Sequence, residues 1–154
     1  MNTRTRTFAF VVLFTAMACF GAEDLNMGSW KLNEAKSKIG PGIPKNTTVV
    51  YEVAGGNVKL TVDGVGADGA PRHSEWMGKF DGKDYPVTGD PASDTRAYKR
   101  VNDHTLSLTA KKGGKVTMYG LIVTSDDGKS RNVDMRGKNA SGKSFSFFAV
   151  YDKQ

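Results

Sequence analysis

The stretch TRAYKRVNDHTLSLTAKKGGKVTMYGLIVTSDDGKSRNVDMRGK, residues 95–138, decides the fold class. Apolar and polar side chains alternate through much of it, in four runs at 95–101, 104–112, 115–124 and 129–138. Turn-forming pairs separate these runs: Asn102-Asp103, Gly113-Gly114 and Asp127-Gly128. Such pairs suit tight hairpin turns, and period-two alternation is typical of half-buried strands. The stretch therefore predicts four consecutive antiparallel strands.

The same pattern extends outward from this stretch in both directions. Further strand-like runs lie at 28–33, 46–54, 57–65, 72–80 and 143–151. A short run at 83–88 is a weaker candidate because Pro86 has no N–H to donate to a sheet. Helical periodicity is limited to one turn at 33–38 with Asn33 as its N-cap, since prolines and glycines follow at once.

Nine or ten short strands in chain order predict an antiparallel up-and-down β-barrel, because consecutive strands joined by tight turns are neighbours in a sheet. Closure into a barrel removes the two exposed edges that such a sheet would otherwise have. A β-sandwich is the main alternative. It needs long crossover connections, and only 33–45 and 86–94 are long enough to provide them.

Residues 1–22 have the order of a secretory signal peptide rather than of a folded segment. Arg4 and Arg6 precede the apolar run FAFVVLF at 8–14, and small residues follow it. A buried N-terminal helix or a membrane anchor is the alternative, but the apolar run is short for a span of about 20 residues. We expect an exported protein, periplasmic or secreted, with a single domain at 23–154.

Two cleavage points fit the pattern, one leaving Cys19 first and one near Gly21 or Ala22. Cleavage before Cys19 would permit a lipid anchor there, although the usual upstream leucine is missing. Cys19 is the only cysteine in the 154 residues. A chain that starts near residue 23 therefore has no disulfide, thiol nucleophile or cysteine metal ligand.

Charge is unevenly distributed along the chain. Residues 23–95 contain 8 Lys or Arg and 11 Asp or Glu, whereas residues 96–154 contain 12 and 5. A basic half raises nucleic acid as a partner. The lysines fall mainly at turns, however, where they are ordinarily solvated, and export also argues against nucleic acid. An anionic small molecule or an anionic surface fits this charge better.

Gly28-Ser29-Trp30-Lys31-Leu32 opens the first predicted strand. It resembles the Gly-x-Trp opening of the lipocalins and the Gly-x-Trp-Lys-Leu opening of the fatty-acid-binding proteins, both in the calycin superfamily. The chain is also similar to small exported lipocalin-like proteins of bacteria. The resemblance implies a barrel that binds small apolar molecules inside, with Gly28 and Trp30 as structural residues at its closed end and no catalytic residues.

The resemblance does not extend to the other motifs of these families. Thr124-Ser125-Asp126-Asp127 only loosely resembles the lipocalin Thr-Asp-Tyr motif, and Lys153 is the candidate for the basic residue that packs over the tryptophan. The helical lid of the fatty-acid-binding proteins does not fit between Leu32 and Asn46. Arg96-Ala97-Tyr98 resembles their terminal Arg-x-Tyr but lies mid-chain. The resemblance therefore supports a fold more than a ligand.

Catalytic and metal motifs are sparse. His73 and Glu75 lie on one face of a predicted strand, which is too few ligands for a metal without others from elsewhere. No Gly-x-Ser-x-Gly motif indicates an activated serine, and no motif predicts a cofactor. A hydrolase or isomerase built around His73 is therefore the least favoured hypothesis, and His104 is expected at a strand end.

Aromatic, methionine and arginine side chains on the strands are the better functional lead. A barrel of about eight to ten strands is either packed inside or holds one small ligand. The candidate ligand-binding residues are Trp76, Tyr98, Met118, Met135, Phe147, Arg96, Arg131 and Arg136. Arginines that point inward could bind a carboxylate. We predict non-catalytic binding of a small, largely apolar ligand with an anionic end, or alternatively a packed barrel that binds an envelope partner or inhibits one.

Overall fold

The computed structural model describes residues 24–154, so the predicted signal peptide and Cys19 lie outside the described residues. The chain forms a closed barrel of ten antiparallel strands in the order β1-β10-β9-β8-β7-β6-β5-β4-β3-β2. Their bounds are β1 Gly28–Leu32, β2 Lys45–Ala54, β3 Asn57–Val65, β4 Pro71–Gly78, β5 Tyr85–Thr88, β6 Thr95–Asn102, β7 Thr105–Lys112, β8 Lys115–Thr124, β9 Ser130–Lys138 and β10 Ser144–Lys153. The predicted up-and-down barrel is confirmed, and the sandwich alternative is wrong.

Tight glycine turns produce this topology. Gly55 and Gly56 join β2 to β3, and Gly113 and Gly114 join β7 to β8, all four with positive φ. Two consecutive residues of positive φ twist the turn in the same sense as the flanking strands. Each hairpin therefore places the next strand beside the last, and the pairing of β1 with β10 closes the ring.

The two connections that suggested a sandwich do not cross the sheet. In the first, Asn33 caps a single 3₁₀ turn, η1 (Glu34–Lys36), and its side chain accepts a hydrogen bond from Lys36 N. Lys38 N then donates to Phe148 O at 2.7 Å, so this loop lies along β10. In the second, β5 interrupts the connection as a four-residue strand that includes Pro86. Both loops return to the neighbouring strand.

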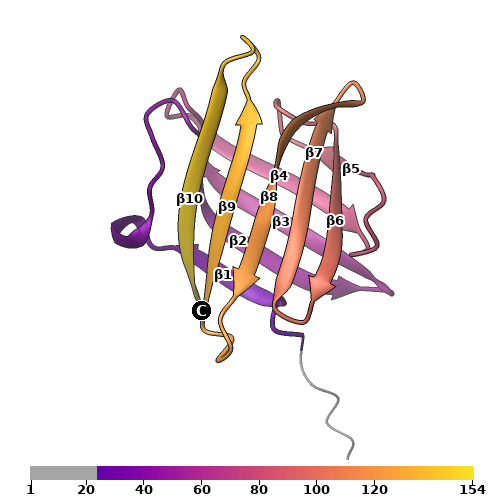
Figure 1. The fold of residues 1–154 in the computed structure, drawn as a ribbon. Helices are drawn as coiled ribbons and strands as arrows, with labels where there is room; N and C mark the ends of the chain where they lie inside the picture. Colours follow the sequence, from indigo (N-terminus) through magenta and orange to yellow (C-terminus); the bar gives the residue numbers. More distant parts are fainter. Residues whose placement is uncertain (1–23) are drawn as a thin grey trace, which may run out of the picture.

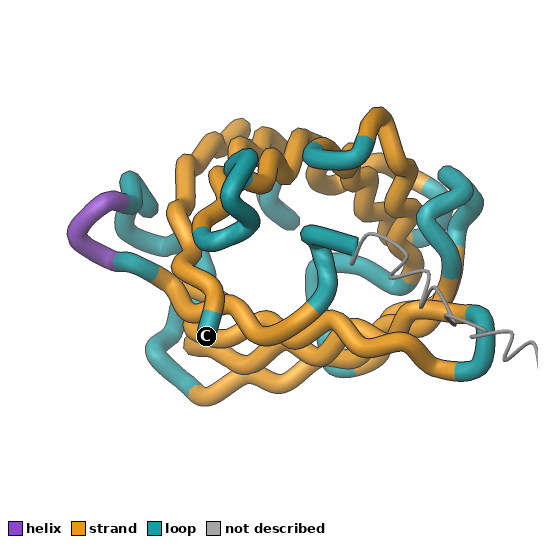
Figure 2. Tube along the Cα trace, turned by 90° about the horizontal axis from the view of Figure 1, so that it is seen from below, coloured by secondary structure: helices purple, strands orange, loops and turns teal. Residues whose placement is uncertain are grey.

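The walls of the barrel consist of β6–β10 on one side and β1–β5 on the other, and the strands of the two walls cross steeply (Figure 1). Figure 2 shows the strands surrounding the interior, with the first described residues lying across one end of the ring. This end also carries the β6–β7 and β8–β9 turns, and we call it the closed end. No helix within residues 24–154 is long and apolar enough to cross a bilayer.

The core fills most of the interior. Alternate residues of each strand point inward, and the largest fully buried side chains include Trp30, Trp76, Leu60, Leu106 and Met135. Trp76 of β4 contacts two other rings: it lies 4.7 Å from Tyr98 of β6 and 6.5 Å from Phe80, which follows β4, measured between ring centroids. Aromatic pairs at these separations stabilise a core beyond the area they bury. The interior is thus aromatic on the β4–β6 side.

Candidate ligand-binding site

A small internal cavity lies between the walls. Its volume is about 60 Å³, and its lining includes six of the eight predicted residues: Arg96, Tyr98, Met118, Arg131, Met135 and Phe147. Pockets for drug-sized ligands measure roughly 300–1,000 Å³. The cavity therefore has room for a few atoms, and the remainder of the interior is packed.

The two other predicted residues do not line this cavity. Trp76 is buried beside it, and its indole N–H donates to the carbonyl oxygen of Arg96 at 3.0 Å. Arg136 is 67% exposed on the outer face, so the expectation that it points into the barrel is wrong. Successive residues of a strand point to opposite faces. Because Met135 points inward, its neighbour Arg136 must point outward.

Arg131 is the unusual residue of the interior. Its guanidinium carbon lies over three rings, at 4.5 Å from Trp30, 4.7 Å from Tyr51 and 5.3 Å from Tyr151. The residue is only 2% exposed. Its Nε and Nη1 atoms have no hydrogen-bond partner among the described residues. Aromatic faces attract the cation, but they leave these N–H groups without an acceptor, which is costly in a buried site.

Arg96 is also buried, but it is paired. Its Nη2 atom lies 2.7 Å from Asp90 Oδ2, in the loop that joins β5 to β6. The Ser93 hydroxyl donates to the same carboxylate oxygen. Burial alone would raise the pKa of Asp90, but the charge of Arg96 and these hydrogen bonds hold it below its usual value. Two arginines thus line the cavity: Arg96 is paired with a carboxylate, and Arg131 is not.

Tyrosine hydroxyls complete the polar groups near the cavity. Burial raises the pKa of Tyr151 to about 12 and raises the pKa of Tyr98 as well. Both therefore remain neutral near pH 7 and act as hydrogen-bond donors or acceptors rather than as anions. Tyr151 already donates to Asn46 O at 2.9 Å. The interior is consequently a cationic site with neutral aromatic walls.

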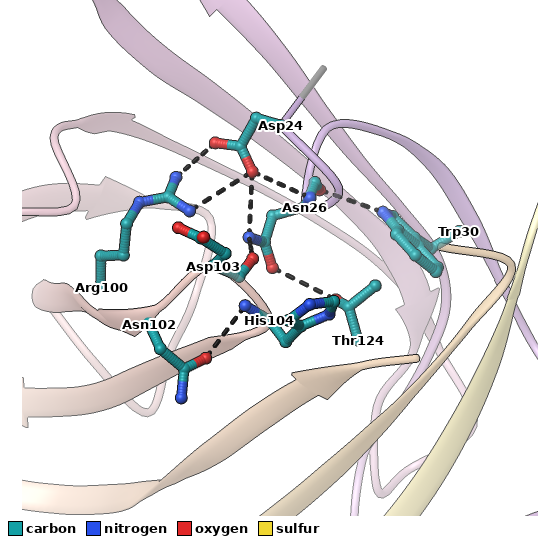
Figure 3. Close-up of polar contacts among 8 residues, drawn as sticks. All are labelled: Asp24, Asn26, Trp30, Arg100, Asn102, Asp103, His104 and Thr124. Carbon is teal, nitrogen blue, oxygen red and sulfur yellow. Dashed lines mark hydrogen bonds and ion pairs between the residues drawn. The ribbon is translucent and has the colours of Figure 1, made fainter. Parts of the chain in front are cut away.

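The closed end is held by residues that the sequence pattern does not single out (Figure 3). Asn26 is fully buried, and its side chain donates to Asp24 Oδ1 at 3.0 Å and accepts from the Thr124 hydroxyl at 3.2 Å. The Asn26 carbonyl accepts from the indole N–H of Trp30 at 3.2 Å. Asp24 in turn pairs with Arg100 of β6. The segment before β1 therefore plugs this end.

Trp30 is fully buried at this closed end, where the calycin resemblance places it. Lys153 lies over its ring with Nζ 5.5 Å from the centroid, and Arg131 lies closer. Gly28 has a φ of 102°, and an added Cβ would press on the Lys153 side chain at 3.0 Å. Lys153 thus occupies the expected position, and Arg131 is a second basic residue that the spacing did not reveal.

The two histidines lie away from the cavity. His73 is exposed on β4, with Nδ1 2.6 Å from Asp63 Oδ1 and Nε2 3.8 Å from Glu75 Oε1. Its hydrogen bond with Asp63 raises the pKa of His73. His104 lies at the β6–β7 turn, 3.8 Å from Asp126. Within residues 24–154, no group of three or more His, Cys, Asp or Glu residues is arranged to hold a metal ion.

Comparison with known proteins gives structural likenesses only. No protein-family model matches the chain, and no curated protein sequence matches it. A structure described as EF1p2_mFAP2b bound to DFHBI has a TM-score of 0.48 and 14% identity, covering 84% of this chain and 94% of that one. A redesigned beta barrel, mFAP1, bound to DFHBI, has a TM-score of 0.44 and 15% identity, covering 84% and 95%. Likenesses at this level do not bear on ligand or activity.

Proposed function

We propose that the barrel binds a small, largely apolar molecule with an anionic end, without catalysing a reaction. One observation carries this proposal: Arg131 is buried at the edge of an internal cavity with two nitrogen atoms unpartnered. Arginine presents its N–H groups as a planar fork that matches a carboxylate. A ligand carboxylate would provide the acceptors that the described chain does not.

The size of the cavity constrains the apolar part of the ligand. About 60 Å³ holds only a short chain or a few waters. A longer tail would require Met118, Met135 or Phe147 to change conformation, and methionine side chains adapt to irregular partners more readily than branched ones. We therefore expect short alkanoates to bind first and longer ones to bind only as these side chains move.

Calycin-like membership and export belong to the same proposal. The Gly28-Ser29-Trp30 opening and the basic side chains over Trp30 support a calycin-like barrel. The pattern of residues 1–22 supports export. N-terminal sequencing of the exported protein should find a start between residues 19 and 23. Recovery of intact Met1 from a soluble exported fraction would contradict the export proposal.

The test of ligand binding compares two arginines of one strand. Calorimetric and NMR titrations with n-alkanoates of increasing chain length are performed on wild type, Arg131→Met and Arg136→Met. Arg136 is the matched control because it is the same residue type on β9 but points outward. We expect Arg131→Met to lose alkanoate binding by about tenfold or more, since a charge-assisted pair contributes about 1.5–3 kcal/mol.

Arg131→Met should remain folded, because replacing a buried charge by an apolar side chain of similar size is often neutral or stabilising. Arg136→Met should bind like wild type. Absence of binding to every alkanoate, or equal binding by Arg131→Met and wild type, would contradict the proposal. If the affinity for alkanoates does not depend on their chain length, only the claim that the ligand is largely apolar would be contradicted.

A second function is favoured by a different observation. Tyr119, Leu121 and Val123 lie in a row on the outer face of β8, each more than 40% exposed. Exposed apolar rows on a sheet often mark a contact with another protein. Leu121→Lys should then abolish binding of an envelope partner, whereas Val53→Lys, at a still more exposed position on β2, should not. Equal binding by both variants would contradict this function.

A further inference from the structure

The barrel wall has the fewest paired strand positions at β5. This strand has four residues and pairs with each neighbour at only two positions, Glu75–Thr88 and Trp76–Val87 on one side and Tyr85–Arg96 and Pro86–Thr95 on the other. By contrast, β9 and β10 pair at nine positions. Pro86 also has no N–H to contribute. Opening the wall at β5 therefore breaks fewer ladder hydrogen bonds than opening the β9–β10 wall.

The loop after β5, residues 89–94, is held by a contact inside the barrel. The Asp90 carboxylate pairs with the guanidinium of Arg96, and Arg96 is one of the residues that line the internal cavity. The Ser93 hydroxyl, which is buried, donates to that carboxylate, and Ala92 N donates to its other oxygen at 2.9 Å. A loop carboxylate would ordinarily lie in water, where it is well hydrated. Here the Asp90 carboxylate instead forms an ion pair with Arg96, an arginine that lines the cavity.

We propose that the loop of residues 89–94 is the gate of the barrel and that Asp90 is an internal stand-in for the ligand: the carboxylate of an incoming ligand first replaces Asp90 on Arg96, which releases the loop, and then moves on to Arg131. This inference rests on the proposed function. The exchange substitutes one arginine–carboxylate pair for another, so Arg96 is not left unpaired in the open state. The displaced Asp90 becomes hydrated as the loop leaves the wall.

The remaining contacts of the loop are compatible with a gate. Val87 N donates to Asp94 O at 3.0 Å, and Asp94 N donates to Lys111 O at 2.9 Å, so its far end stays attached to β7. The Asp94 carboxylate accepts from Gly113 N at 2.8 Å and does not contact Arg96. Residues 89–93 therefore form the part of the loop that moves, and Asp94 is the hinge that stays attached to the barrel.

The experiment measures association of dansyl-labelled undecanoate by stopped-flow fluorescence. The variant is Asp90→Asn, which removes the competing charge but keeps the shape, and the matched control is Asp94→Asn in the same loop. We expect association to be about tenfold faster and affinity to be higher for Asp90→Asn, because the open state is more populated. Asp94→Asn should bind at the wild-type rate.

A second measurement uses wild type alone, in case Asp90→Asn does not fold. Hydrogen exchange is followed by NMR at increasing decanoate concentration. The amides of residues 89–93 should exchange faster as the concentration rises, because each entering carboxylate displaces Asp90 from Arg96. Slower or unchanged exchange there, or identical kinetics for Asp90→Asn and Asp94→Asn, would overturn the gate while leaving ligand binding in place. If shorter alkanoates bind but dansyl-undecanoate and decanoate do not bind wild type or the variants, the gate is overturned as well. If no alkanoate of any length binds, the proposed function itself fails.

Discussion

The closed end and the β5 side of the barrel are built in opposite ways. At the closed end, Asn26 hydrogen-bonds to Asp24, Thr124 and Trp30, and an ion pair joins Asp24 to Arg100, so several independent contacts hold one plug. On the β5 side, a four-residue strand pairs with each neighbour at two positions, and Arg96 holds the following loop through Asp90 and Ser93. Many backbone pairings resist opening, whereas an arginine–carboxylate pair can be exchanged for another. If the proposed gate operates, the region that stabilises the barrel is separate from the region that admits the ligand.

The largest expected effect is the loss of Trp30. Trp30→Ala should lower the free energy of unfolding by about 3–5 kcal/mol, because it removes a fully buried indole and leaves a cavity that the braced plug cannot fill. Trp76→Ala should cost less, since the short β5 beside it can collapse inward. Urea unfolding measures both variants. If Trp30→Ala lowers the free energy of unfolding less than Trp76→Ala does, the β5 side rather than the closed end is the more rigid region.

Overpacking should have an intermediate effect. Met135 is 1% exposed and borders a cavity of only about 60 Å³. Met135→Trp should therefore lower the free energy of unfolding by about 1–3 kcal/mol and abolish alkanoate uptake, because the new ring exceeds the space available. Urea unfolding and NMR titration measure the two effects. Unchanged stability together with retained uptake would indicate a larger interior than the structure contains.

Acid should weaken the plug through Asp24. Burial opposes ionisation, but hydrogen bonds from Asn26 and Arg100 hold the pKa of Asp24 below its usual value of 3.8. A carboxylate whose pKa is lowered by folding stabilises the protein above the unfolded pKa, and this stability is lost as pH falls through the folded pKa. Wild type should therefore lose its advantage over Asp24→Asn between about pH 5 and pH 2.

The urea midpoint of both proteins, measured across that interval, tests the expectation. Asp68→Asn serves for comparison, because the pKa of Asp68 is lowered mainly by a hydrogen bond from Ala70 in an exposed turn. Its loss of stability in acid should have the same direction but be smaller. A constant difference between wild type and Asp24→Asn at every pH would show that Asp24 acts by shape rather than by charge.

The smallest effect concerns His73, far from both regions. Its pKa is raised from 6.5 by the hydrogen bond with Asp63. A histidine whose pKa is raised by folding stabilises the protein below the unfolded pKa, and this stability is lost as pH rises through the folded pKa. His73→Gln should thus be slightly less stable than wild type near pH 5.5 and equal to it near pH 8.5. NMR titration of the imidazole checks the direction, and a pKa below 6.5 would contradict it.

Strand positions could be predicted from local pattern, because turn pairs and period-two alternation act over a few residues. Asn33 caps its helical turn as expected, and the strands agree with the predicted runs within about two residues. The weakest prediction, the run at 83–88, became the four-residue β5. Its Pro86 limits pairing without preventing it, and it is this short strand that leaves the wall thin.

The candidate site could be predicted only in part. Alternation places Met135 and Arg131 on one face of β9, four residues apart, and by the same rule excludes Arg136. The pairing of Arg96 with Asp90 has no such local signal, since it depends on how a loop folds back over the wall. Likewise, nothing before Gly28 distinguishes Asn26 as a buried residue until Thr124 and Trp30 are brought beside it.

By itself, the sequence determined an all-β chain of short strands in meander order, because turn chemistry and alternation are properties of neighbouring residues. Only the tertiary structure decided which charges lie inside and whether they are paired. Arg131 and Arg96 carry the same group on inward positions, yet one faces three aromatic rings and the other faces Asp90. That difference arises from closure of the ring, which brings together residues distant in sequence and sets the acceptors available to each buried donor.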